Sequence, residues 1–112
     1  MRVAEEAIIA QEQTQAPQQG QKPLSAEEAQ QLARQVSDWK LQGDKLERDL
    51  KFADFNEAIE FVNEVAHVAA AADHHPDIQV SYNKVRLTLS THKIGGLSRN
   101  DFIVAARIDE VL

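Results

Sequence analysis

The feature that most constrains the fold is a segment of helical periodicity that begins at Asp54 and must end before Pro76. Asp54 and Glu57 have the spacing of a capping box, whose side chains bond the free amide groups at a helix start. Pro76 disfavours helical geometry at the residue before it, so we expect this longest helix to stop around residues 73 to 75. Apolar residues keep the spacing of one helix face at Phe55, Ala58, Ile59, Val62, Val65, Ala66 and Ala69.

Two further helices are predicted, one on each side of this segment. Ser25 and Glu28 form a capping box after Leu24, and an apolar stripe follows at Ala29, Leu32, Ala33 and Val36. After a pair of glycines, Ser98 and Asp101 have the same capping spacing. The stripe of this last helix consists of Val104, Ala105, Ile108 and Val111.

Alternation of apolar and polar residues predicts two hairpins between these helices. The first pairs residues around Trp39 and Leu41 with residues 46 to 52 across a turn at Gly43 and Asp44. The second turns at Asn83, and its apolar positions are Ile78, Val80, Tyr82, Val85, Leu87 and Leu89. The expected fold class is α+β in the order α-β-β-α-β-β-α. We expect a four-stranded antiparallel sheet with the helices packed on one face, and open sheet edges that favour self-association.

The N-terminal residues differ in composition from the rest of the chain. Residues 11 to 22 hold six glutamines, a proline and a glycine, and no large apolar side chain that could offset the entropy of ordering them. We therefore predict a flexible Gln-rich arm over residues 1 to 22 and one domain over residues 23 to 112. Apolar residues near Ile8 and Ile9 leave a short helix open as an alternative to a frayed end.

Composition narrows the functional classes. Twelve Lys and Arg against eighteen Asp and Glu give a net charge of -6, the wrong sign for a protein that binds a phosphate backbone, so we expect no nucleic acid partner. The absence of cysteine excludes disulfides and thiolate chemistry. No apolar run is long enough to span a bilayer, and Glu5 and Glu6 do not suit a targeting peptide. We expect a cytoplasmic protein without a membrane partner.

One group of residues could carry chemistry, because imidazole titrates close to neutral pH. Two or three histidines around one pocket can donate and accept protons without a metal or a prosthetic group. The residues concerned are His74, His75, Pro76, Tyr82, His92 and Asp101.

Each of these residues also has a structural explanation when taken alone. His74 and His75 suit a helix C-terminus, where the helix dipole favours a positive charge. Tyr82 is by default a strand aromatic, and His92 falls on the polar side of its predicted strand. A carboxylate at Asp101, third in a capped helix, is stabilising in any protein.

Their joint spacing resembles a known motif. His74-His75-Pro76, five residues, Tyr82, nine residues, His92, eight residues and Asp101 match the signature of the pterin-4a-carbinolamine dehydratases. The stretches DHHPDIQVSYNKVRLTLSTHKIGGLSRNDF and FADFNEAIEFV are similar to that family, and the likeness runs from about residue 24 to the C-terminus.

The resemblance implies dehydration of 4a-hydroxytetrahydrobiopterin to quinonoid dihydrobiopterin. It implies that His74, His75 and His92 are the catalytic and pterin-binding histidines, that Asp101 supports them, and that the protein forms dimers or tetramers. The further supporting residues are Asp73, Pro76 and Tyr82. No metal and no cofactor are implied, since the pterin is the substrate.

One position departs from the family pattern. Four residues before His74 the family has a charged or titratable residue, and this chain has Ala70, with Asp73 and His67 as the nearby replacements. This departure and the N-terminal arm resemble pterin dehydratase-like proteins that act as RuBisCO assembly factors in carboxysome-containing bacteria. The alternative function is therefore an inactive or weak relative that acts as an assembly chaperone, with the RuBisCO large subunit as partner. A histidine-ligated metal site is disfavoured, because adjacent histidines converge poorly on one ion.

Overall fold

The computed structural model describes residues 8–112, and the helices and strands in it follow the predicted order. The elements are α1 (Ala26–Ala33), β1 (Lys40–Gln42), β2 (Lys45–Lys51), α2 (Phe55–Ala72), β3 (Asp77–Ser81), β4 (Lys84–Leu89) and α3 (Arg99–Glu110). Short 3₁₀ turns lie at Ile9–Gln11, Arg34–Val36 and His92–Ile94. The predicted α+β class and the order α-β-β-α-β-β-α are confirmed.

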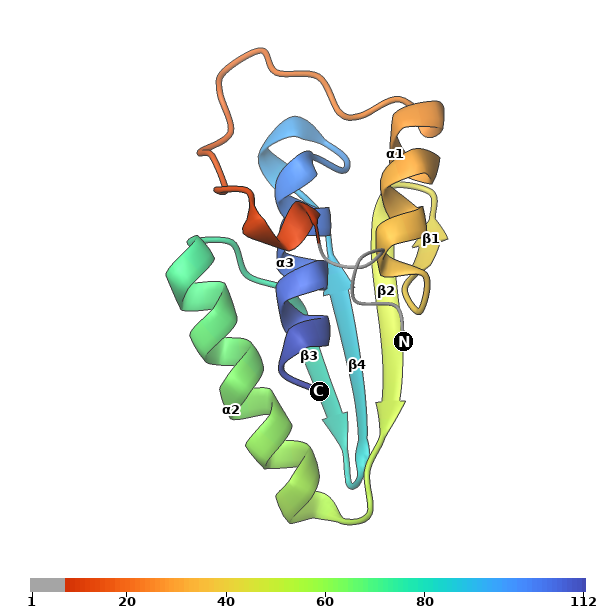
Figure 1. Cartoon of the computed structure of the whole chain (residues 1–112), viewed down its shortest axis with the longest axis vertical. Coiled ribbons are helices and arrows are strands. Elements are labelled where there is room, and N and C mark those ends of the chain that lie inside the picture. The colour runs from red at the N-terminus through yellow and green to blue at the C-terminus, as the bar shows by residue number, and fades with distance from the viewer. Residues whose placement is uncertain (1–7) are drawn as a thin grey trace.

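The four strands form one antiparallel sheet in the order β1-β2-β4-β3. The three α-helices of residues 8–112 lie on one side of this sheet, and α2 runs along the edge on which β3 lies (Figure 1). On the two central strands, the alternate positions that carry apolar side chains face the helices. Leu46 lies opposite Leu89 there, and Leu50 lies opposite Val85. The side chains on the other face of the sheet are largely charged, and Arg86 and Asp49 form an ion pair there. The layered arrangement with helices on one face is therefore confirmed.

Each helix begins at its predicted cap. Ser25 and Glu28 exchange the two hydrogen bonds of a capping box at α1, and the side chain of Asp54 accepts from the amide of Glu57 at α2. Ser98 donates its amide to the carboxylate of Asp101 at α3, at 2.9 Å. None of the helices within residues 8–112 is long and apolar enough to cross a membrane.

The N-terminal segment lies against α3 from residue 9 to residue 15, which its composition did not lead us to expect. Ile9 is fully buried in the core, and its amide donates to the side chain of Gln35. Arg107 donates to the carbonyl groups of Ala10 and Glu12. The start of the expected arm, residues 1 to 7, lies outside the described residues, and the domain boundary at residue 22 stays a prediction.

A charged side chain on the inner face of the sheet breaks the expected alternation. Arg48 lies between Leu46 and Leu50 on β2, where it faces the helices with little exposure. It bonds the carboxylate of Asp109 near the end of α3, and the indole of Trp39 donates to the same oxygen at 2.8 Å. Burial raises the pKa of Asp109 above its ordinary value, against the opposing effects of Trp39 and Arg48.

Candidate functional site

The end of α2 sets the position of His74. The helix stops at Ala72, and Asp73 takes a left-handed conformation with φ of 52°, so that the His74 amide donates back to the carbonyl of Ala69 at 3.2 Å. Such a turn reverses the chain at a helix C-terminus and satisfies its free carbonyls. The predicted stop between residues 73 and 75 is confirmed, and the turn directs His74 toward the start of α3.

His74 meets Asp101 there. Its Nε2 lies 2.6 Å from Oδ1 of Asp101, whose side chain is fully buried, whereas the His74 side chain keeps 11% of its exposure. The other oxygen of Asp101 accepts from the hydroxyl of Thr91 at 2.8 Å and from the amide of Ser98 at 2.9 Å. Three donors from three segments of the chain therefore converge on one buried carboxylate.

This network fixes the direction of each proton. An ionised carboxylate only accepts, so Nε2 of His74 carries the proton of that contact, and Nδ1 is the ring position left for other partners. The single proton of the Thr91 hydroxyl points at Asp101. In the 2.8 Å contact between the hydroxyls of Thr91 and Ser98, Ser98 must then be the donor. A buried carboxylate that orients an imidazole in this way is a frequent device of acid–base sites.

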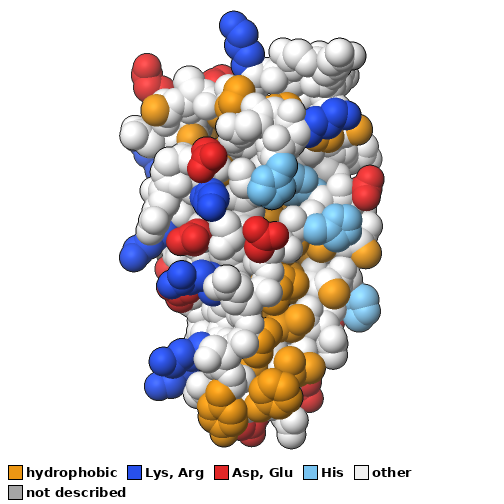
Figure 2. Space-filling model, turned by 180° about the vertical axis from the view of Figure 1, so that it is seen from behind, with side chains coloured by type: hydrophobic (Ala, Val, Ile, Leu, Met, Phe, Trp, Pro, Cys, Tyr) orange, Lys and Arg blue, Asp and Glu red, His pale blue; other side chains and the backbone are white. Residues whose placement is uncertain are grey.

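His75 and His92 each follow a residue that binds Asp101. His75 comes directly after His74 and His92 directly after Thr91, and both side chains are exposed. The prediction that His92 sits on the polar side of a strand is wrong, because β4 ends at Leu89 and His92 opens a 3₁₀ turn. Figure 2, seen from behind, shows histidine side chains from the upper centre down the right-hand side of the molecule. Each of the two exposed histidines is therefore one residue along the chain from a hydrogen-bond partner of Asp101.

The remaining predicted residues occupy different places. Pro76 is buried at the entry to β3, and Asp73 is exposed at the turn before His74. Tyr82 lies at the hairpin tip after β3, where it is 66% exposed and has φ of 54°. A strand rises about 3.3 Å per residue, which puts the backbone of Tyr82 roughly 20 Å from that of His75. The structure does not bring Tyr82 to His74 within one chain.

The position that departs from the family pattern is exposed on α2. Ala70 lies one turn before His74, and its carbonyl accepts from the amide of Asp73 at 3.3 Å. His67 lies on the same helix with an 80% exposed side chain beside Glu64. His67 thus belongs to the helix surface and has no described contact with Asp101.

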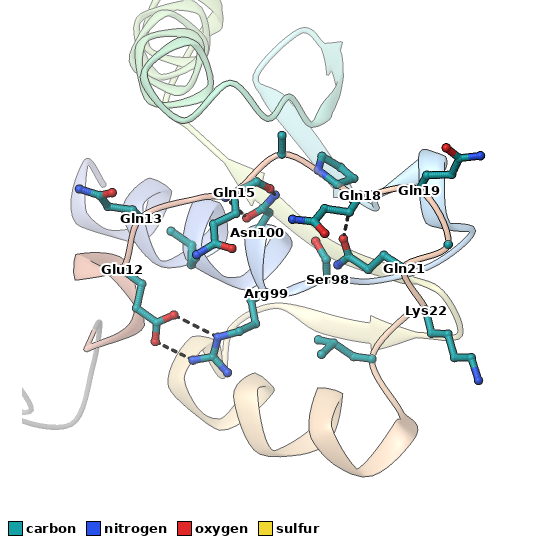
Figure 3. A pocket seen from close by; sticks show the side chains of 15 residues that line it. Glu12, Gln13, Gln15, Gln18, Gln19, Gln21, Lys22, Ser98, Arg99 and Asn100 are labelled. Atoms are coloured by element: carbon teal, nitrogen blue, oxygen red, sulfur yellow. Dashed lines mark hydrogen bonds and ion pairs between the residues drawn. The ribbon is translucent and has the colours of Figure 1, made fainter.

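Sequence reasoning missed the part of the chain that borders this site. Residues 12 to 22 arch over the start of α3 and leave a hollow of about 690 Å³, in which glutamine side chains face Ser98, Arg99 and Asn100 (Figure 3). None of the four histidines lines this hollow. Across residues 8–112 no group of three or more His, Asp or Glu side chains is placed to hold a metal ion.

The arrangement defines a class of site: an imidazole oriented by a buried carboxylate at the junction of a helix end and a helix start, with exposed histidines next in the chain to His74 and to Thr91. Such a site can move protons to and from a bound molecule. The sequence profile of pterin 4 alpha carbinolamine dehydratase matches residues 22–111. The chain belongs to the pterin-4a-carbinolamine dehydratase family, as its motif predicts.

Relatives of similar length support this assignment. A protein of Nostoc sp. is 52% identical over 88 residues, which is 79% of this chain and 95% of that protein. A protein of Chloroflexus aurantiacus is 52% identical over 87 residues, which is 78% of this chain and 92% of its own. Both are named provisionally as pterin-4-alpha-carbinolamine dehydratases.

Two solved structures share the fold. A transcriptional coactivator/pterin dehydratase from Brucella melitensis superposes with a TM-score of 0.76 at 29% identity, over 80% of this chain and 98% of that one. A pterin dehydratase-like protein described as a RuBisCO assembly factor in the alpha-carboxysome gives a TM-score of 0.53 at 20% identity. That match covers 65% of this chain and 84% of the other. At 20% identity the second likeness concerns the fold alone.

Proposed function

We propose that this protein dehydrates 4a-hydroxytetrahydrobiopterin to quinonoid dihydrobiopterin by histidine acid–base catalysis. The observation that carries the proposal is the bond between Nε2 of His74 and the buried Asp101. It orients the ring and leaves the lone pair on Nδ1 available to a substrate. Two further imidazoles, His75 and His92, supply the second proton carrier that the reaction needs.

The reaction balances with these groups and no cofactor. A protonated exposed histidine gives its proton to the 4a-hydroxyl group, the C4a–O bond breaks and water leaves. Nδ1 of His74 takes the proton from N5, and the electron pair of that N–H bond forms the C4a=N5 double bond. The two histidines return to their starting states when the proton passes from His74 back to the exposed ring through solvent.

A second candidate, assembly of another protein such as RuBisCO, rests on Ala70. The missing titratable side chain removes one polar group from the site's border, and a protein with a weakened site could keep only a binding role. The relatives at 52% identity carry the name of the enzyme, whereas the assembly factor is 20% identical. The dehydratase is therefore the better supported candidate.

Self-association is proposed with either function. β3 is an edge strand of the sheet, and its Val80 is an exposed apolar side chain. An unpaired edge with an apolar side chain is a suitable place for a second copy to extend the sheet. Sedimentation of the wild type and of a Val80→Lys variant would show whether this edge holds the copies together.

A stopped-flow assay of carbinolamine dehydration tests the catalytic proposal. We expect the wild type to exceed the spontaneous rate, and His74→Ala to lose about 10² to 10⁴ of that acceleration, the usual contribution of a general acid or base. His67→Ala is the matched control, because its ring is exposed on the same helix. A wild type and a His74→Ala variant that are equally inert would leave the assembly function as the proposal.

A further inference from the structure

Two consecutive residues of the N-terminal segment touch the two elements that carry the His74–Asp101 pair. The hydroxyl of Thr14 donates to the carbonyl of Ala72 at 2.7 Å. Ala72 is the last residue of α2, two residues before His74, and its carbonyl has no partner within the helix. Thr14 therefore holds the helix end from which His74 projects.

Gln15 is held at the start of α3. Its amide donates to Oδ1 of Asn100 at 3.0 Å, and Nδ2 of Asn100 donates to its carbonyl at 2.6 Å. Asn100 is buried and directly precedes Asp101. Both hydrogen bonds use one planar amide, which leaves little freedom of rotation between Gln15 and the first turn of α3.

The segment is anchored along the length of α3 as well. Glu12 and Arg99 form a pair of hydrogen bonds at 3.0 and 2.6 Å, as Figure 3 shows, and Arg107 binds the backbone of Glu12 further along the helix. The guanidinium of Arg99 lowers the pKa of Glu12. Ile9 is inserted in the core at the far end. The residues that precede Thr14 and Gln15 are therefore held in place on α3 and in the core.

We infer that residues 12 to 15 form a strap that sets the spacing between the end of α2 and the start of α3, with Thr14 and Asn100 as positioning residues for His74. The strap lies outside residues 22–111, which the family profile covers. The inference rests on the proposed function for its catalytic consequence. The physical claim, that the strap controls the contact between His74 and Asp101, does not depend on the reaction.

The test uses substitutions that remove the one side-chain hydrogen bond of Thr14 or the two of Asn100. Thr14→Val keeps the shape and deletes the hydroxyl, Thr14→Ser restores it, and Asn100→Leu deletes the amide. Gln13→Ala is the matched control, because Gln13 is exposed within the same segment. Two readouts are taken on the full chain: the Nε2 proton of His74 in ¹H–¹⁵N spectra of ¹⁵N-histidine-labelled protein, and kcat and KM for dehydration.

We expect Thr14→Val and Asn100→Leu to shift the Nε2 resonance of His74, to speed its exchange with solvent, and to lower kcat about tenfold at similar KM. Thr14→Ser and Gln13→Ala should match the wild type. If both deletions lower the unfolding temperature but leave the resonance, its exchange and kcat unchanged, the strap is only structural and the inference fails. If the wild type is inert and the resonance still responds, the positioning claim holds and the dehydratase proposal fails.

Discussion

Nε2 of His74 and Oδ1 of Asp101 lie 2.6 Å apart although the two residues are 27 positions apart in the chain. The contact joins the C-terminal turn of α2 to the N-terminal turn of α3, so both ends of this bond are held by capped helices. Because Asp101 also accepts from Thr91 and Ser98, its carboxylate cannot rotate to follow a displaced ring. The position of the imidazole is therefore sensitive to small shifts of either helix.

Restoring a carboxylate at Ala70 should increase the rate. A glutamate there would stand one helical turn before His74, on an exposed position that accommodates a longer side chain. A further polar group beside an acid–base pair can add up to about 10²-fold in rate. Stopped-flow dehydration by Ala70→Glu measures the gain, and Ala66→Glu, one turn further from His74, should leave the rate as it is. No gain with Ala70→Glu would mean that the site lacks more than this one group.

Tyr82 should be dispensable for the reaction within one chain. It belongs to the family motif, yet it lies at the far end of β3 from His75. We expect Tyr82→Ala to keep kcat/KM within about twofold of the wild type, since no interaction with the transition state is removed. A large loss of activity would instead show that Tyr82 reaches the site of a second copy. In that case, mixing with His74→Ala chains, which keep Tyr82, should restore activity.

The stability of the protein should depend on the ionisation of Asp109. Burial raises the pKa of Asp109 above its ordinary value of 3.8. A raised pKa favours the protonated form in the folded state, so this stabilisation is complete below pH 3.8 and is lost as the pH rises through the higher folded value. Asp109→Asn keeps an acceptor for the indole of Trp39 but cannot titrate. Urea unfolding at several pH values should show the wild type losing stability relative to Asp109→Asn as the pH rises, and a difference independent of pH would contradict the assignment.

Gly96 has no space for a side chain. A Cβ at this position would lie 2.8 Å from Cβ and 3.1 Å from Cγ of Pro23, next to the hydrogen bond from the amide of Leu24 to the carbonyl of Leu97. We expect Gly96→Ala to lower the free energy of unfolding by about 1 to 3 kcal/mol, as overpacking does elsewhere. Adding Pro23→Gly should recover part of this loss in a double-mutant cycle, whereas simple additivity would show that the contact is not the cause.

Local signals account for what the sequence predicted well. Capping boxes at Ser25 and Ser98 and the stop at Pro76 act within a few residues, so the ends of the helices could be read from neighbouring positions. Strand alternation likewise gave the two hairpins, because one face of the sheet is buried and the other is exposed.

The features that the sequence did not predict are contacts between residues far apart in the chain. Arg48 finds its partner Asp109 61 residues later, and Arg107 binds the backbone of Ala10 97 residues earlier. The pairing of His74 with Asp101 was visible only through the family motif, since the capping position alone explained Asp101 equally well. Composition suggested a flexible arm because only two buried residues, Ile9 and Ala10, and a few long-range side-chain bonds hold residues 9 to 15.

The dehydration rate of Asp101→Asn tests the central claim most directly. The amide would turn an NH2 group toward at least one of three donors, so we expect the free energy of unfolding to fall by about 1 to 3 kcal/mol. Asp77→Asn, an exposed substitution at the start of β3, is the control. Measured on folded protein, Asp101→Asn should dehydrate the carbinolamine about 10²-fold more slowly than the wild type, because His74 loses the acceptor that orients it. A folded Asp101→Asn protein with the wild-type rate would contradict the account.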